Sequence, residues 1–405
     1  MSKSERTSTP AIYIAANDLL VYASAISQPT GIQRVASGLA EALTERHGAQ
    51  TVVLTSDSAR LVELPTLDRP ARGARSPFGL FREPALRLLA RAPRRLQELV
   101  RRLARAALAK SAASRGGLPV ALNPGDVILV LGAPWIAPGM ASAAIALRES
   151  YGVNLGLLVH DLLPVTSPTW FADAQGRAAK TDVEALIAHA SALFAVSREV
   201  AAELSLRYQK RATVIKLAEP PLSMLHQPRT RGLYVLYVGT LHPRKNLEAL
   251  VQIWSRWADA PKLIIAGRRH PQDGSLFRAL AASPAASARI ELRHDVDDAE
   301  LGRLYANARF LVLPSLAEGW GLPVREAFAA GRPAIATDAV PAAVDSPFAA
   351  IVPSGDTDTL ERTIHEWWDS DLPEALASRI ATEFKPRTWG DAAAELVADL
   401  VRPAN

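Results

Sequence analysis

The chain has 405 residues, too many for one compact core, so we expect about two domains. Its 49% hydrophobic and 21% charged residues are typical of globular proteins and argue against a disordered or membrane-embedded chain. Because there is no cysteine, disulfides and thiolate metal sites are excluded, which fits a reducing compartment. The first ten residues lack the apolar core of a signal peptide, and we expect a cytoplasmic protein.

The net charge of +5 is unevenly distributed along the chain. Residues 69–115 hold twelve arginines and one lysine against two glutamates, and leucines recur there near helical spacing. One interpretation is a solvated helical insertion at 69–118. The other is a basic amphipathic stretch that binds an anionic membrane surface. A nucleic-acid partner is disfavoured, because aromatic residues for base stacking are scarce in this stretch.

Strand-like runs alternate with helical patterns from the beginning of the chain, which predicts parallel sheets. In the first half the expected strands are 11–16, 51–55, 127–131, 154–160, 192–196 and 213–217, with helices at 31–46, 180–190 and 198–208. The uncharged run 127–147 is long enough for a membrane span, but prolines and a glycine interrupt it. We therefore predict a strand, a loop and a helix of small residues there.

The segment 219–231, with its prolines and arginines, is the predicted linker. After it, strands are expected at 233–238, 262–266, 290–292, 310–313, 333–337 and 350–352, with helices at 245–259, 298–308, 357–369 and 389–401. The predicted architecture is α/β, with two doubly wound Rossmann-like domains facing each other across a cleft. Their expected bounds are 1–218 and 232–386, followed by a C-terminal helix within 387–405.

The segment from Leu311 to Gly331 is the most informative motif. It reads as a buried strand, a glycine-rich loop and a short helix, with a glutamate in the loop (Glu318) and another in the helix (Glu326). Loops at the carboxyl ends of parallel strands bind ligands, and a helix N-terminus there attracts phosphate. Carboxylates accept hydrogen bonds from sugar hydroxyls. The segment therefore indicates a nucleotide-sugar site.

A second motif runs from Gly239 to Asn246 and contains Arg244 and Lys245 where a strand gives way to a helix. Such a cation pair can stabilise the charge that develops on a diphosphate leaving group without a metal ion. Alone, the pair would be interpreted as an exposed basic helix start. The neighbouring Glu318 segment favours the functional interpretation.

Two motifs of the first half are more ambiguous. His160 and Asp161 follow a buried strand, so the histidine lies at the sheet edge and can bind a hydroxyl, although the pair can equally cap a loop. Gly31 and Arg34 lie where a long helix begins, at a place suited to a phosphate or an acceptor, although a helix capped by Thr30 explains the pattern as well.

Together these motifs resemble the retaining glycosyltransferases of the GT-B fold, family 4, and most closely the mannosyltransferase-type enzymes of bacterial O-antigen, capsule and exopolysaccharide synthesis. The matching stretches are 30–35, 125–130, 159–164, 195–198, 239–246 and 318–330, in the family's order. The two glutamates separated by seven residues are specific to this family type, and each of the other stretches is less specific.

The resemblance implies a role for each matching residue. Arg244 and Lys245 would bind the donor diphosphate, Glu318 would lie beside the transferred sugar, and His160 would lie near that sugar. Binding of the donor would further involve Glu326, toward the ribose, together with Gly239, Gly319, Trp320, Gly321 and Leu322. The acceptor would meet Gly31, Arg34 and Asp161. No metal ion or cofactor is implied, and the donor would be a nucleotide-diphosphate sugar, with GDP-mannose as the first candidate and a glycan, free or lipid-linked, as acceptor.

The sequence departs from the family pattern at Thr240, where many relatives have arginine, in the arginine-rich insertion, and in 338–346, which lacks the usual Gly and Glu signature. Two other classes of function remain open at this point. One is a non-catalytic GT-B-fold scaffold of a polysaccharide assembly complex. The other, a dinucleotide oxidoreductase, is disfavoured because no Gly-x-Gly-x-x-Gly motif follows a strand.

Overall fold

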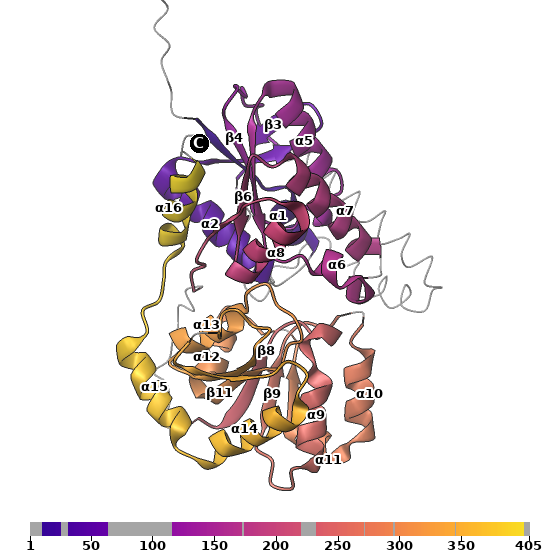
Figure 1. Cartoon of the computed structure of the whole chain (residues 1–405), viewed down its shortest axis with the longest axis vertical. Coiled ribbons are helices and arrows are strands. Elements are labelled where there is room, and N and C mark those ends of the chain that lie inside the picture. The colour runs from indigo at the N-terminus through magenta and orange to yellow at the C-terminus, as the bar shows by residue number, and fades with distance from the viewer. Residues whose placement is uncertain are drawn as a thin grey trace, which may run out of the picture. The chain divides into compact units, whose positions relative to one another are not determined.

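A computed structural model describes residues 10–25, 31–63, 116–171, 174–219, 232–270, 272–294, 296–344 and 346–400. The arginine-rich stretch 69–115 and the linker residues 220–231 lie outside the described residues. Contacts divide the chain into two compact units (Figure 1). Unit 1 comprises Met1–Ala195, Ala201–Ile215 and Trp389–Asn405, and unit 2 comprises Val196–Val200 and Lys216–Thr388.

Unit 1 is built on a seven-stranded sheet with the order β3-β2-β1-β4-β5-β6-β7. Its strands are β1 (Ile12–Ala15), β2 (Gln50–Leu54), β3 (Ala59–Leu61), β4 (Val127–Val130), β5 (Asn154–Val159), β6 (Ala192–Ala195) and β7 (Thr213–Val214). All neighbours are parallel except β2 and β3, which are antiparallel. The helices are α1 (Asn17–Ala25), α2 (Gly31–His47), α5 (Met140–Tyr151), α6 (Leu163–Thr166), α7 (Ala174–His189) and α8 (Arg198–Tyr208), with short 3-10 turns η1 (Pro134–Ile136) and η2 (Pro168–Phe171).

Most elements expected in unit 1 are confirmed, and the misses have physical reasons. Helix α8 has the predicted bounds, whereas α7 begins six residues before the predicted Lys180. Helix α1 was not predicted, because Leu19, Leu20 and Val21 are all buried, so it has no polar face to give a helical period. Strand β7 is shorter than expected, and β3 is a three-residue edge strand too short for a pattern.

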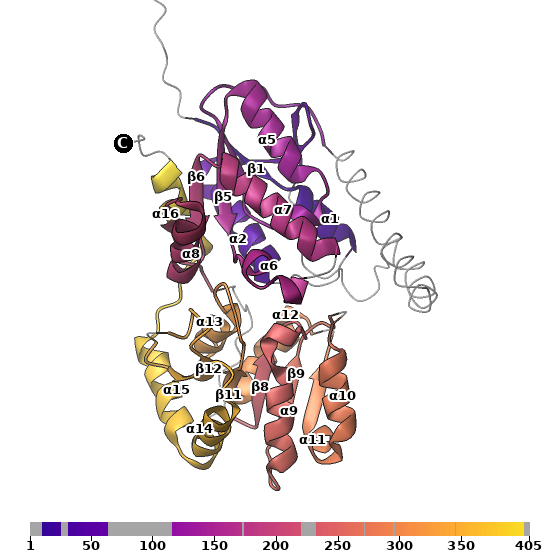
Figure 2. The same cartoon turned by 45° about the vertical axis from the view of Figure 1, so that its right-hand side comes forward.

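The C-terminal helix α16 (Trp389–Leu400) packs on α2 within unit 1, and the two lie side by side in both views (Figures 1 and 2). The approach is close: a Cβ added to Gly38 of α2 would lie 2.4 Å from the Trp389 indole nitrogen. At the other end of α16, Thr213 of β7 donates a hydrogen bond to Asp399 at 2.8 Å. The chain end thus completes the first unit.

Unit 2 is built on a six-stranded parallel sheet with the order β10-β9-β8-β11-β12-β13. The strands are β8 (Tyr234–Val238), β9 (Leu263–Ala266), β10 (Ile290–Arg293), β11 (Ala308–Leu313), β12 (Ala334–Thr337) and β13 (Ala349–Val352). The helices are α9 (Leu247–Arg256), α10 (Gly274–Ala282), α11 (Pro284–Arg289), α12 (Asp298–Asn307), α13 (Leu322–Ala329), α14 (Thr357–Asp369) and α15 (Leu372–Glu383), with a 3-10 turn η3 (Pro243–Lys245).

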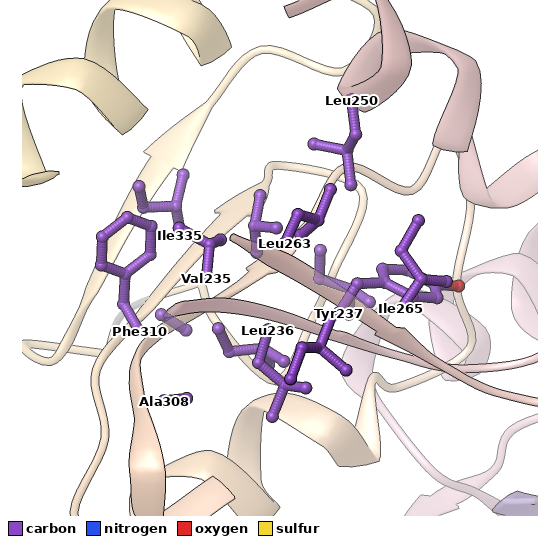
Figure 3. Packing of buried hydrophobic residues seen from close by; sticks show 14 of the residues in the cluster. Val235, Leu236, Tyr237, Leu250, Leu263, Ile265, Ala308, Phe310 and Ile335 are labelled. Atoms are coloured by element: carbon purple, nitrogen blue, oxygen red, sulfur yellow. The ribbon is translucent and has the colours of Figure 1, made fainter. Parts of the chain in front are cut away.

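The core of unit 2 explains why its strands were recognisable. Buried apolar side chains of β8, β9, β11 and β12, among them Val235, Leu263, Phe310 and Ile335, gather with Leu250 of α9 (Figure 3). Strands covered on both faces have continuous apolar runs, as in parallel sheets generally. Burying such side chains contributes roughly 1.5 to 3 kcal/mol each.

The strand order of unit 2 places the chain's two strongest motifs beside each other. From β8 the chain adds β9 and β10 on one side, then returns to add β11, β12 and β13 on the other. The order therefore reverses between β8 and β11, which is the position where doubly wound sheets bind ligands, beyond the carboxyl ends of the strands. The motif with Arg244 follows β8, and the motif with Glu318 follows β11.

The predicted single helix 245–259 is wrong in detail. The chain forms η3, passes through Asn246 in the left-handed conformation (φ 53°) and then begins α9 at Leu247. By contrast, α14 has the predicted bounds, and α13 begins with Pro323 in its first turn and is followed by Gly331 at φ 73°, as expected. Within the described residues, no helix is long and apolar enough to cross a membrane.

We predict that Gly38→Val lowers the free energy of unfolding by about 1 to 3 kcal/mol, because the new side chain would overlap Trp389. Chemical denaturation of the full chain measures this loss of stability. The matched control is Gly38→Val with Trp389→Ala, in which space is available and the two losses should be less than additive. Additive losses would contradict packing of Trp389 on Gly38.

Candidate functional site

The loop after β8 begins at Gly239, whose backbone conformation favours glycine. Gly239 has φ 152°, and its N–H donates to the Ala266 carbonyl of β9 at 2.9 Å. A Cβ on Gly267 would lie 1.8 Å from the Gly239 carbonyl oxygen. The two glycines thus let the ends of β8 and β9 approach closely before the chain turns toward η3.

The η3 turn presents the cation pair. Pro243 occupies its first turn, and the His242 side chain accepts a hydrogen bond from the Arg244 N–H at 3.1 Å. Arg244 and Lys245 are the last two residues of this turn. The left-handed Asn246 then separates η3 from α9 and fixes where the two cations lie.

The loop after β11 is joined to η3 through the main chain as well as through side chains. The Leu316 N–H donates to the Arg244 carbonyl at 2.7 Å. The Arg244 guanidinium donates from Nη1 to the Ala317 carbonyl at 2.8 Å and to Glu318 at 2.7 Å. Lys245 pairs with the other carboxylate oxygen of Glu318. Two strand ends separated by about seventy residues therefore form one site.

Glu318 is the centre of this cation cluster, which we define as Arg244, Lys245 and Glu318. The Glu318 side chain is 7% exposed, that of Lys245 8% and that of Arg244 20%. Burial alone would raise the pKa of the Glu318 carboxyl, but the charges and hydrogen bonds of Arg244 and Lys245 lower it to about 2. Glu318 is therefore ionised at neutral pH, and the cluster carries a formal charge of +1.

Two hydroxyls hold Glu318 in place. Ser315 donates to its carboxylate at 2.8 Å, and Thr337, the last residue of β12, donates to the Ser315 carbonyl at 2.5 Å. Both side chains are buried, so their positions are fixed by packing. The ends of β8, β11 and β12 thus all contribute to the geometry of the cation cluster.

Glu326 lies in the second turn of α13 and is buried. Tyr305 of α12 donates a hydrogen bond to its carboxylate at 2.7 Å, which orients the group. Helix α13 begins after Gly321, whose φ of 103° favours glycine and whose added Cβ would lie 2.5 Å from Val340. The N-terminus of α13 thus lies in the same loop as Glu318.

The loop residues Gly319, Trp320, Gly321 and Leu322 connect the cation cluster to α13. Trp320 is partly buried against the core of unit 2, and its carbonyl accepts from the Ala342 N–H at 2.9 Å. Its indole nitrogen is buried and has no hydrogen-bond partner among the described residues. Among the described residues, the Trp320 ring therefore makes packing contacts and no side-chain hydrogen bond.

His160 and the residues predicted to meet the acceptor belong to unit 1. His160 follows β5, and its Nε2 lies 2.7 Å from the Leu131 carbonyl oxygen. Since a carbonyl only accepts, Nε2 carries the hydrogen and Nδ1 is left as the acceptor. Burial lowers the pKa of His160, so the ring is neutral at pH 7. Asp161 accepts from the Leu163 N–H at 3.1 Å and so caps the following turn.

Gly31 is exposed at the first residue of α2, and Arg34 is half-buried one turn later. Residues 26–30 lie outside the described part, so the expected cap at Thr30 stays a prediction. Gln33, between them, is buried in unit 1.

Four residues that support the site were not predicted: His242, Ser315, Thr337 and Tyr305. Each acts through hydrogen bonds to other residues of the site. Ser315 could have been suspected from its position three residues before Glu318, and His242 from its place just before a proline. Nothing local to Thr337 or Tyr305 indicates a role, because their partners lie 22 and 21 residues away in the chain.

We predict that Glu318 stabilises unit 2 in a pH-dependent way. Its carboxyl pKa is about 2 in the fold against 4.5 for an unperturbed glutamate, so the stabilisation is complete above pH 4.5 and lost as the pH falls toward 2. Urea unfolding should show wild type more stable than Glu318→Gln by on the order of 3 kcal/mol at neutral pH, with the difference closing between pH 4.5 and 2.

The control is Glu383→Gln, which removes an exposed carboxylate paired with Arg379 and should change stability little at any pH. A difference between wild type and Glu318→Gln that stays constant down to pH 2 would contradict the ion pairing of Glu318.

Comparison with known proteins places this site in a family context. Residues 232–370 match the family described as "Glycosyl transferases group 1". The O-antigen chain mannosyltransferase B of Escherichia coli is 34% identical over 122 residues, which are 29% of this chain and 32% of that protein. The O-antigen chain mannosyltransferase RfbU of Salmonella typhimurium is 33% identical over 28% of this chain and 31% of its own length. The matches thus span about a third of these relatives.

Solved structures match over nearly the whole chain. Sucrose-phosphate synthase from Thermosynechococcus elongatus has a TM-score of 0.64 at 20% identity, covering 96% of this chain and 97% of that one. Anabaena HepE, solved with UDP and glucose, has a TM-score of 0.61 at 15% identity, covering 96% and 98%. The chain therefore has the GT-B fold, and residues 232–370 of its second unit match the group 1 glycosyltransferase family.

Proposed function

We propose that the protein is a retaining glycosyltransferase that moves a sugar from a nucleotide-diphosphate donor without a metal ion. The observation that carries this proposal is the cation cluster at the switch point of the second sheet, adjoining the loop that starts α13. Arg244 and Lys245 there offer two fixed positive charges to a diphosphate, and Glu326, one turn into α13, offers a carboxylate to the ribose.

The cluster suits the charge changes of the reaction. As the bond from the anomeric carbon to the phosphate oxygen breaks, negative charge grows on the diphosphate. Buried cations already held in position stabilise that charge at little reorganisation cost. The acceptor oxygen forms its new bond on the face that the diphosphate leaves, and the acceptor's proton passes to the leaving phosphate oxygen. The configuration at the anomeric carbon is thereby retained.

Glu318 takes a different role in this proposal from a simple sugar contact. Without it, Arg244 and Lys245 would be two like charges close together at a largely buried site, which is costly. By neutralising one charge, Glu318 keeps the pair in place before the donor arrives. The same loop, through Gly319, Trp320, Gly321 and Leu322, then adjoins the transferred sugar.

For the sugar, the acceptor and the location, the names of the relatives give the first candidates. Relatives described as O-antigen chain mannosyltransferases favour mannose, and GDP-mannose as its donor. The acceptor would be a growing, lipid-linked surface polysaccharide, which His160, Gly31, Arg34 and Asp161 of unit 1 would meet. The enzyme would then work in the cytoplasm, on the inner face of the plasma membrane.

We predict that Lys245→Ala and Glu326→Ala each reduce turnover at least about a hundredfold, because each removes a group that meets the donor. Transfer is measured in the presence of EDTA, with UDP- and GDP-sugars as donors and lipid-linked glycans as acceptors. NMR of the product should show the anomeric configuration of the donor sugar.

The matched control is Lys262→Ala, which removes a half-exposed lysine paired with Glu291 at the edge of the sheet and should retain full activity. Full sugar transfer by both Lys245→Ala and Glu326→Ala would refute the proposal. Donor binding without transfer to any acceptor would favour a scaffold instead.

We also predict salt-sensitive binding to vesicles that contain anionic lipid, because the stretch 69–115 carries a large excess of arginine. Co-sedimentation should show binding that falls as salt rises and that is absent for neutral vesicles. A variant lacking 72–115 should lose it, and vesicle binding that survives the deletion would exclude this role for the stretch.

A further inference from the structure

One buried side chain beside the cation cluster has no role in the function proposed so far. His242 precedes η3, is 7% exposed and comes from the loop after β8. Its Nδ1 accepts a hydrogen bond from the Arg244 N–H at 3.1 Å, and its carbonyl accepts from the Lys245 N–H at 2.9 Å. One residue therefore holds the backbone of both cations.

The direction of the first hydrogen bond fixes the state of the ring. Because a backbone N–H can only donate, Nδ1 of His242 must carry a lone pair, and the imidazole is neutral in this geometry. A neutral ring beside Arg244 and Lys245 also avoids placing a third positive charge next to the pair. The cap thus constrains both the geometry and the charge of the site.

The loop after β9 packs against the ring of His242. The His270 ring lies edge-on to it, with 4.5 Å between ring centroids. The backbone of His270 is itself held, because its backbone N–H donates to Asp273 at 3.3 Å. Asp273 in turn accepts two hydrogen bonds from Arg269. Leu241 continues the pairing of β8 with β9 by donating to the Arg268 carbonyl at 2.9 Å. The rotamer of His242 is therefore set by a neighbouring strand end.

We propose that His242 is a positioning residue for donor binding, which orients Arg244 and Lys245 toward the diphosphate by capping η3 with its neutral Nδ1. This inference rests on the function proposed above and names a further residue of the same site. His242 acts through the two cations and needs no contact with the donor itself. Loss of the cap would let η3 unwind, so that the cations spend part of their time away from the diphosphate.

The identity of residue 242 separates a capping role from general packing. Asparagine is among the best side chains for accepting from an N–H at the start of a helix, whereas leucine and alanine cannot accept. His242→Asn therefore keeps the acceptor and loses much of the ring. His242→Leu keeps bulk and loses the acceptor. A residue that only fills space would prefer leucine, whereas a capping residue prefers asparagine.

The test measures affinity of the full chain for GDP and UDP by calorimetry, together with kcat and KM for the donor. For whichever diphosphate binds, His242→Leu should raise Kd by about fivefold to tenfold, while His242→Asn stays within about threefold of wild type. KM for the donor should rise in parallel, and kcat should change less than KM. His242→Ala carries the same expectation as leucine without adding bulk, should His242→Leu not fold.

The matched control is His365→Leu, at a half-buried histidine of α14 that packs against Trp257, just after the end of α9. It should leave the affinity for the diphosphate unchanged, even where it lowers Tm. Equal Kd values for wild type, His242→Leu and His242→Ala would overturn the inference, as would an asparagine variant as weak as leucine. Wild type that binds neither diphosphate would overturn the proposed function, and this inference with it.

Discussion

The ion pairing of Glu318 with Arg244 and Lys245 is the interaction on which the second unit's site depends. Two cations at a largely buried position repel each other and lose hydration, and each effect opposes folding. The carboxylate removes both problems and keeps its own charge because the cations lower its pKa to about 2. The ends of β8 and β11 are joined by this charge interaction, by the Arg244 contact to the Ala317 carbonyl and by a backbone hydrogen bond from Leu316.

The fold makes that interaction possible through its strand order. Because the strand order reverses between β8 and β11, the carboxyl ends of these two strands are neighbours at the switch point of the sheet. The glycines at the strand ends let the backbone turn sharply, and Gly239 and Gly267 approach so closely that a side chain on Gly267 would collide with the backbone. A sheet of parallel strands thus supplies the position, and a few glycines supply the room.

How far the sequence predicts this structure depends on the distance over which each signal acts. Helix α14 has a local apolar period and strand β5 a continuous apolar run, and the predicted bounds of both are close to the observed ones. Residues 17–22 of α1 are all buried and β3 has only three residues, so neither has a period to recognise. The charges of Arg244, Lys245 and Glu318 were evident, but the ion pair joins residues 73 and 74 positions apart, and no local pattern encodes such a contact. The break of the helix at Asn246 depends on a left-handed residue that the helical period of 247–256 hides.

Helix α13 shows why the site is held rigid before any ligand arrives. Two successive residues of this helix are fixed in different directions. Glu326 accepts from Tyr305 of α12, while Arg325 binds Glu219, whose other oxygen accepts from the Arg387 N–H. Arg325 also stacks on Phe384, 4.7 Å from the ring centroid. Glu219, near the start of unit 2, and Arg387, near its end, are thus both joined to the helix that carries Glu326. In the proposed function, a carboxylate held by its neighbours in this way would lose little side-chain entropy on binding a ribose hydroxyl, and less of the hydrogen-bond energy would be spent on ordering the side chain.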